Sequence, residues 1–159
     1  MKEDLVPVTL LALDQSSKVT GYAIFIDGVL DYHGKINLTS ENVGIRLVQF
    51  KEAIVDIIDS FKVDKIAFED IQLQSTVANN VKTFKVLAEV FGVLHELCEE
   101  LKIPYVIVPS VTWKSALGIK GKTRPEQKQQ AADFVFNKYN KKPTQDECDA
   151  ICIGTYAIK

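Results

Sequence analysis

The order of the apolar runs along this chain constrains its fold more than any other feature. Runs of strand length occupy residues 8–14, 19–26, 29–37, 63–69 and 105–108. The first three follow one another directly, and Asp27-Gly28 is a hairpin turn signal between the second and the third. The later runs alternate with helical patterns. We therefore expect an α/β fold with a mixed five-stranded sheet that is flanked by helices.

Helices are expected after the third strand and through the C-terminal third. The first begins near residues 39–42, and its apolar positions are Ile45, Val48, Ile54, Val55, Ile58 and Phe61. A later helix begins at Arg124, and its apolar positions are Ala131, Val135 and Phe136. A polar loop at 137–144 then leads to a last helix, which starts near Asp146.

The composition is that of a globular protein. At 159 residues, with 47% hydrophobic and 25% charged residues, the sequence predicts one domain that spans residues 1–159. No apolar run reaches the roughly 18 residues of a membrane span. The acidic N-terminus, Met1-Lys2-Glu3-Asp4, differs from a signal peptide. We therefore expect a cytoplasmic protein that makes no contact with a membrane.

Three cysteines, Cys98, Cys148 and Cys152, lie in apolar helical contexts. Cys148 and Cys152 are four residues apart and could share a helix face. A zinc site would need further ligands, and neither His33 nor His95 is near them in sequence. Buried free thiols are therefore the expectation, because cysteine prefers protein interiors.

The charges are distributed unevenly along the chain. The net charge is −2, but residues 1–109 carry 10 basic and 16 acidic groups, net −6. Residues 110–145 carry eight basic and two acidic groups, net +6, and residues 146–159 are net −2. A basic segment that leads into an acidic pair suits a phosphodiester substrate, since cations attract its backbone. The alternative is a solvated, lysine-rich surface loop.

Residues 76–102 form a long helical pattern with two apolar stripes. The first stripe contains Val77, Val81, Phe84, Leu87, Phe91, Leu94, Cys98 and Leu101. The second contains Val86, Val90, Val93 and Leu97. Phe84 and Val86 differ by about 200° in direction, so the stripes are expected on opposite sides of the helix. A helix buried on two sides indicates a subunit contact, and the alternative is a core helix covered by the same chain.

Four carboxylates lie at the ends of apolar elements: Asp14, Glu69, Asp146 and Asp149. Adjacent parallel strands would place Asp14 and Glu69 side by side at one edge of the sheet. Asp146 and Asp149 are three residues apart and would share a helix face. Because converging carboxylates repel one another unless cations lie between them, we predict a divalent-metal site that serves phosphodiester hydrolysis. Taken singly, Asp146 could be a helix N-cap and Asp14 could start a turn.

Three segments resemble the motifs of RuvC-type Holliday junction resolvases. Residues 11–23 resemble the first motif, which is an apolar strand, an Asp, a Ser-containing turn and a Thr-Gly-Tyr strand. Residues 66–70 resemble the second motif, in which a Glu ends the fourth strand. Residues 146–154 resemble the third, an Asp-x-x-Asp-Ala pattern on the last helix. The three motifs follow the family's order and spacing along nearly the whole chain.

The resemblance implies a ribonuclease H-like fold and a homodimer in contact through helix 76–102. It implies branched DNA as the substrate, two Mg²⁺ ions per site that Mn²⁺ can replace, and products with 5′-phosphate and 3′-hydroxyl ends. The metal ligands would be Asp14, Glu69, Asp146 and Asp149. Lys114 aligns with a family residue that assists near the scissile phosphate, so it joins the catalytic set. The expected DNA contacts are Lys114, Lys120, Lys122, Arg124 and Lys128.

The segment after the second motif departs from the family pattern. Bacterial members often carry an aromatic residue there, which wedges into the junction, whereas this chain has none between Glu69 and Gln74. Gln72 or Leu73 would have to take that role. We therefore hypothesise a divergent, phage-encoded member that acts in the bacterial host cytoplasm and also cuts forks and three-way junctions.

Other functions are compatible with parts of this pattern. A different ribonuclease H-like nuclease would act on RNA or RNA–DNA hybrids. A non-catalytic junction-binding protein could keep the fold, although four intact carboxylates argue against it. An actin-like sugar kinase would need glycine-rich phosphate loops and a second domain, and this chain has only 8 glycines without such a cluster.

Overall fold

A mixed sheet organises the part of the chain that the computed structural model describes, which is residues 8–71 and 78–158. Its strands are β1 (Thr9–Asp14), β2 (Val19–Ile26), β3 (Val29–Asn37), β4 (Lys65–Glu69) and β5 (Tyr105–Val108). Within the described residues the sheet has five strands in the order β3-β2-β1-β4-β5. β1 pairs antiparallel with β2 and parallel with β4, and β4 pairs parallel with β5. The predicted mixed sheet is confirmed.

Local sequence accounts for the central strands and the hairpin. Five of the six residues of β1 are buried, as expected for a strand covered on both faces. The β2–β3 hairpin turns at Asp27 and Gly28, whose φ angles are 50° and 80°. Both angles are positive, as a two-residue type I′ turn requires, and Asp-Gly is a preferred pair there. The predicted hairpin is therefore confirmed.

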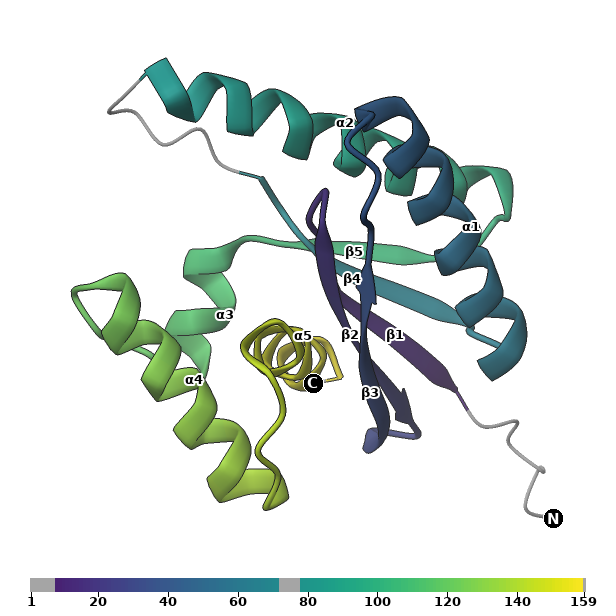
Figure 1. The fold of residues 1–159 in the computed structure, drawn as a ribbon. Coiled ribbons are helices and arrows are strands. Elements are labelled where there is room, and N and C mark those ends of the chain that lie inside the picture. The colour runs from purple at the N-terminus through teal and green to yellow at the C-terminus, as the bar shows by residue number, and fades with distance from the viewer. Residues whose placement is uncertain (1–7, 72–77, 159) are drawn as a thin grey trace, which may run out of the picture.

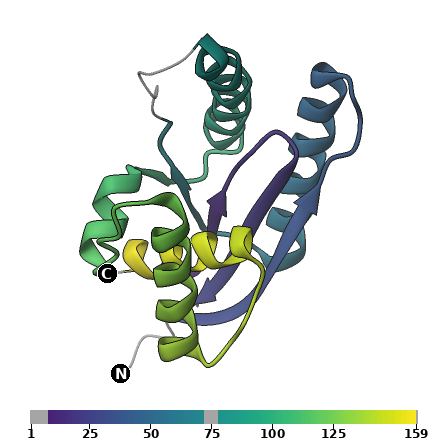
Figure 2. The ribbon, with the colours of Figure 1, turned by 60° about the vertical axis from the view of Figure 1, so that its left-hand side comes forward.

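Helices cover both faces of the sheet (Figures 1 and 2). They are α1 (Val43–Phe61), α2 (Ala78–Glu100), α3 (Ser110–Ala116), α4 (Arg124–Tyr139) and α5 (Gln145–Ala157). α1 and α2 pack on one face, where they bury alternate strand residues such as Leu11, Leu13 and Phe68. α5 lies across the other face, and α3 and α4 pack beside it. The alternation of strand side chains thus divides the core into two layers.

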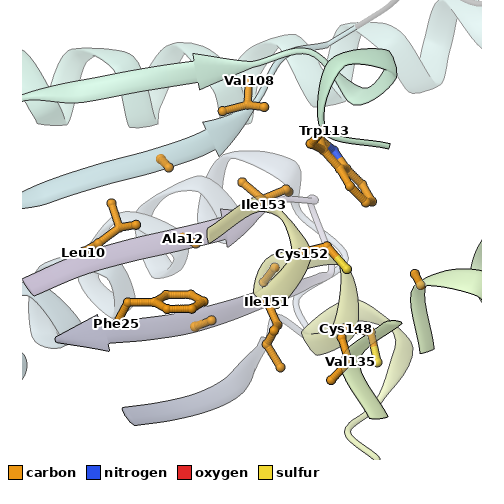
Figure 3. Close-up of a cluster of buried hydrophobic side chains, with 14 of the residues drawn as sticks. Leu10, Ala12, Phe25, Val108, Trp113, Val135, Cys148, Ile151, Cys152 and Ile153 are labelled. Carbon is orange, nitrogen blue, oxygen red and sulfur yellow. The ribbon is translucent and has the colours of Figure 1, made fainter. Parts of the chain in front are cut away.

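The layer under α5 brings the C-terminal helix close to the strands (Figure 3). Ile151, Cys152 and Ile153 of α5 are fully buried there. Gly154 lies so close to the ring of Phe25 that a Cβ at this position would collide with the ring. The absence of a side chain at Gly154 therefore lets α5 pack closely against β2.

The structure corrects several helix expectations. α4 continues to Tyr139, into the loop predicted at 137–144, and Phe136 is 43% exposed. On α1, Ile45 and Val48 are exposed rather than packed. The buried residues of α1 are Arg46, Phe50, Ile54, Ile57 and Ile58. The stripe that faces the sheet is therefore set by Phe50 and Ile54, and the two earlier apolar residues point elsewhere.

The two apolar stripes predicted for 76–102 do not lie on two buried sides. The fully buried residues of α2 are Val90, Leu94, Leu97 and Cys98, and each stripe supplies two of them. The stripes are therefore the edges of one broad face that packs on the sheet and on α1. Val81, on the N-terminal half that extends past the sheet in Figure 1, is 53% exposed. Residues 76–77 lie outside the described residues, and α2 ends at Glu100.

Two further expectations concern the cysteines and the membrane. Cys98, Cys148 and Cys152 are buried free thiols, as predicted. Burial raises the pKa of the Cys98 and Cys148 thiols to about 11, so neither is a thiolate at neutral pH. Within the described residues, no helix has the length and apolar character needed to cross a membrane.

Candidate metal centre

Asp14 and Glu69 lie side by side because their strands are parallel neighbours. The register pairs Leu13 with Phe68, and each strand ends one residue later, at its carboxylate. Both side chains therefore emerge at the same edge of the sheet, where the strands' carboxyl ends form binding sites in α/β folds. This placement is as the sequence predicted.

α5 brings Asp146 and Asp149 to the same edge, and Gly21 makes this approach possible. Gly21 is the β2 partner of Asp14. A Cβ built on Gly21 would collide with the carbonyl oxygen of Asp146. Only glycine lets the first turn of α5 lie directly against β2 at this point. The third motif (residues 146–154) thus meets the first motif (residues 11–23) where the backbone of Asp146 lies against Gly21.

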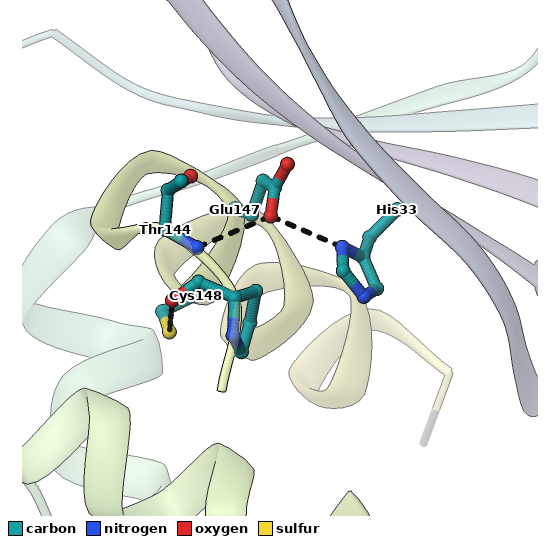
Figure 4. Close-up of polar contacts among 5 residues, drawn as sticks. His33, Thr144, Glu147 and Cys148 are labelled. Atoms are coloured by element: carbon teal, nitrogen blue, oxygen red, sulfur yellow. Dashed lines mark hydrogen bonds and ion pairs between the residues drawn. The ribbon is translucent and has the colours of Figure 1, made fainter. Parts of the chain in front are cut away.

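The start of α5 is anchored by Glu147 rather than by Asp146 or Asp149 (Figure 4). Glu147 Oε2 accepts a hydrogen bond from the backbone N–H of Thr144 at 3.2 Å and lies 3.1 Å from Nδ1 of His33 on β3. Thr144 is the N-cap of α5 and forms a capping box with Glu147. The alternative interpretation of Asp146 as the N-cap is therefore wrong.

The four carboxylates line one pocket of about 690 Å³ together with three cations: Lys114, Arg124 and Lys128. These cations come from the basic segment predicted at 110–145. Lys120 and Lys122 do not line the pocket and are exposed. The structure therefore brings three of the five expected DNA-contacting residues to the carboxylates.

Burial and mutual repulsion make this carboxylate group unfavourable when it is fully ionised. Burial, followed by the charges of Glu69, Asp149 and Asp146, raises the pKa of Asp14 well above its usual range. Burial is also the largest cause that raises the pKa of Glu69, and it raises the pKa of Asp149 to about 6. Lys114 acts in the opposite direction on all three groups. Such strongly shifted groups in one pocket indicate a functional site.

The donor set fits hard divalent cations. Carboxylate oxygens are the ligands that Mg²⁺ and Mn²⁺ prefer, and a cation between the carboxylates would relieve their repulsion. Among the residues that the structure describes, no three His, Cys, Asp or Glu side chains are already gathered closely enough to hold an ion. The four carboxylates line one pocket and are the residues that would hold such an ion.

Three contacts at the site, made by Gln15, Trp113 and Gln127, were not predicted from the sequence. Gln15 bonds through its side-chain amide to the backbone of Glu69, and Trp113 Nε1 donates to Glu69 Oε2 at 3.0 Å. Lys114 Nζ donates to Gln127 Oε1 at 3.1 Å, which ties α3 to α4. The only signal in the sequence is that Gln15 and Trp113 are the neighbours of Asp14 and Lys114.

Comparison with known proteins agrees with this arrangement. The chain matches the family model for crossover junction endodeoxyribonuclease RuvC over residues 10–156. It belongs to the RuvC family. The match spans all three motifs, so the resemblance drawn from the sequence is confirmed, and RuvC membership makes the chain a junction-resolving endonuclease by family. No curated protein sequence matches it.

Solved structures show the same RuvC fold at low sequence identity. RuvC of T. thermophilus in complex with a Holliday junction substrate is 14% identical, with a TM-score of 0.72 over 95% of this chain and 94% of that one. Fowlpox virus resolvase with Holliday junction DNA is 13% identical, with a TM-score of 0.63 over 95% and 97%. The yeast mitochondrial Holliday junction resolvase Ydc2 is 15% identical, with a TM-score of 0.53 over 95% and 78%. These likenesses confirm the ribonuclease H-like fold.

Proposed function

We propose that this chain resolves four-way DNA junctions by hydrolysing phosphodiester bonds with two Mg²⁺ ions, which Mn²⁺ can replace. Asp14, Glu69, Asp146 and Asp149 would hold the ions. The observation that carries this proposal is that three elements distant in sequence deliver these carboxylates to one pocket with Lys114, Arg124 and Lys128. Carboxylates for metal and cations for phosphate are the two requirements of such a reaction.

The chain's own residues have distinct tasks in this scheme. When bound, divalent ions would lower the pKa of a coordinated water and would stabilise charge on the attacking and leaving oxygens. Lys114, held by Gln127, would bind the scissile phosphate, because its charge acts on Asp14, Glu69 and Asp149 at once. Arg124 and Lys128 would hold the neighbouring backbone. Cleavage would leave 5′-phosphate and 3′-hydroxyl ends.

The test is cleavage of a synthetic mobile four-way junction with Mg²⁺, beside the variant Asp14→Asn. The wild type should give paired nicks, and Asp14→Asn should bind the junction but cut at least about 100-fold more slowly, since metal-ligand loss removes several kcal/mol of transition-state stabilisation. Equal cleavage by both proteins would remove the metal assignment. Binding without cleavage by the wild type would favour a non-catalytic junction-binding protein, and preferential cutting of RNA–DNA hybrids would favour another ribonuclease H-like nuclease.

We further propose that the working unit is a homodimer, because symmetric nicks across a junction need two sites related by a two-fold axis. The N-terminal half of α2 offers a surface for this contact: Val81 is 53% exposed, and Phe84 and Val86 nearby are half-buried. Analytical ultracentrifugation should show a dimer that Val81→Glu converts to monomer. Val29→Glu, at a valine that is 68% exposed on β3, is the matched control and should remain dimeric.

The breadth of the substrate range is a separate proposal. Gln72 and Leu73, the candidates for opening the junction, lie outside the described residues. We propose that the chain is a single domain that acts in the cytoplasm, which would be the cytoplasm of a bacterial host if the chain is phage-encoded. We also propose that it cuts forks and three-way junctions in addition to four-way junctions. Parallel assays on four-way, three-way and forked DNA decide the point, since exclusive cutting of four-way junctions would contradict it.

A further inference from the structure

The ladder between β1 and β4 ends just before the metal site, and a side chain continues it. Backbone pairing runs to Leu13 and Phe68, after which the chain turns away at Gln15. β4 goes on to pair with β5 at Glu69 and Val108. The backbone N–H and C=O of Glu69 on the β1 side therefore have no strand partner, and buried backbone groups require one.

Gln15 supplies both missing partners. Its Nε2 donates to the carbonyl oxygen of Glu69 at 2.6 Å, and its Oε1 accepts from the N–H of Glu69 at 3.2 Å. The side-chain amide has the same donor and acceptor as a peptide group, so it forms one more rung of the ladder. Gln15 is 8% exposed, which shields both bonds from water. Because Gln15 follows Asp14, this rung fixes the backbones of the two strand-end carboxylates relative to each other.

Gln15 holds the backbone of Glu69, and Trp113 holds its carboxylate. Its indole Nε1 donates to Glu69 Oε2 at 3.0 Å, and an indole can only donate. The ring is 1% exposed and packs in the core layer under α5, so its position is fixed by its surroundings (Figure 3). Within the described residues, no hydrogen bond to Oε1 of Glu69 accompanies this one. The indole thus uses one lone pair of Oε2, and Oε1 is the carboxylate oxygen that has no protein donor in the described part of the chain.

We infer that Gln15 and Trp113 are positioning residues that orient Glu69 as a metal ligand. Gln15 fixes its backbone beside Asp14, and Trp113 fixes its carboxylate so that Oε1 is the oxygen offered to the ion. This inference rests on the proposed function. Partners of metal ligands typically change metal affinity 10- to 100-fold when they are removed. Trp113 is also followed directly by Lys114, so the same short helix sets a metal ligand and a phosphate-binding cation.

The test measures Mn²⁺ binding by isothermal titration calorimetry, apart from catalysis. Trp113→Phe keeps an aromatic ring but removes the N–H, and Gln15→Met keeps the shape but removes both bonds. Each should weaken Mn²⁺ binding about 10-fold, while junction affinity measured without metal stays within about twofold. Gln129→Met, at an exposed glutamine of α4, is the control for the same chemical change and should bind Mn²⁺ as the wild type does.

A second readout uses the fluorescence of Trp113, the chain's single tryptophan. Paramagnetic Mn²⁺ bound by Glu69 should quench it in the wild type, and Gln15→Met should shift the quenching midpoint about 10-fold to higher Mn²⁺. Should Trp113→Phe fail to fold by circular dichroism, Gln15→Met alone carries the test. Unchanged Mn²⁺ affinity in the folded variants would overturn the inference alone. Absence of Mn²⁺ binding by the wild type would overturn the proposed function instead.

Discussion

At the scale of single residues, the carboxylates of the pocket are held where their charge is costly. Asp149 illustrates this, because burial raises its pKa from 3.8 to about 6 despite the opposing charges of Lys114, Lys128 and Arg124. The pKa of Asp14 is also raised well above its usual range, by burial and by the charges of three neighbouring carboxylates. A protein keeps such a cluster only where something compensates for it, and function is the usual reason.

The first prediction concerns the pH dependence of stability without metal. A carboxyl whose pKa rises on folding binds its proton more tightly in the folded state, so the stability that it confers is present below pH 3.8. That stability is lost as the pH rises through about 6. In EDTA, the melting temperature of the wild type should therefore fall between pH 4 and pH 6 by at least about 2 °C more than that of Asp149→Asn.

Scanning fluorimetry across this pH range measures the melting temperatures of both proteins. Above pH 6, Mg²⁺ should reverse the fall in melting temperature in the wild type only. Asp149→Asn serves as the reference because it removes the titrating group and leaves the remaining carboxylates in place. Parallel pH profiles of the two proteins would contradict the prediction.

At the scale of elements, the site depends on how closely α5 approaches the sheet. Two glycines make this approach possible: Gly21 against the backbone of Asp146, and Gly154 against the ring of Phe25. His33 and Thr144 then hold Glu147 and so fix the first turn of the helix. The carboxylate pocket therefore depends on the packing of α5 against β1 and β4, which together supply its four carboxylates.

The second prediction is that Gly21→Ala displaces Asp146 and Asp149 from Asp14. The added methyl group would meet the carbonyl of Asp146, a backbone atom that cannot rotate away. Because a misplacement of about 1 Å can cost 100-fold in rate, cleavage should fall about 100-fold while junction binding is kept. Gly92→Ala on α2 is the matched control, since nothing lies within 4 Å of its added methyl group. Equal activity of the two variants would show that α5 can shift without harm to the site.

At the scale of the whole molecule, the basic and acidic groups occupy different parts of the sequence, and the fold brings some of them together in one pocket. The +6 segment at 110–145 comprises α3, α4, the loop between them and the loop that leads into α5. Three of its cations line the pocket with the carboxylates. The backbone N–H groups of Lys120 and Gly121 both donate to Gln130 Oε1 of α4, which fixes this loop. Lys114, Arg124 and Lys128 thus lie beside the carboxylates of the pocket in a protein whose net charge is −2.

The third prediction is that Arg124 and Lys128 bind DNA phosphates. Removing one cation that neutralises a phosphate should lower the slope of log affinity against log salt concentration by about 0.9. The double variant Arg124→Gln, Lys128→Gln should therefore lower the slope by about 1.8 in fluorescence anisotropy titrations on a four-way junction. Lys62→Gln, at the end of α1, is the control. An unchanged slope in the double variant would show that neither Arg124 nor Lys128 contacts the DNA phosphates.

Much of the fold could be predicted because its signals are local. The hairpin at Asp27-Gly28 and the strands from Val19 to Ile26 and from Val29 to Asn37 lie where the alternation and the turn residues indicate. α2 was harder to predict. Its two stripes became one broad face once α1 and the sheet were in place, because the sequence does not say which arc of a helix meets a neighbour.

The sequence by itself determined the succession of strands and helices and the chemistry: four carboxylates at element ends and a basic segment before the last pair. Those features are set by residue type and spacing, which act locally. The tertiary structure decided which groups meet. It brought Lys114, Arg124 and Lys128 to the pocket rather than Lys120 and Lys122, and it placed Gln15 and Trp113 against Glu69. Such contacts join residues 44 to 54 positions apart, and only packing in three dimensions brings them within hydrogen-bonding distance.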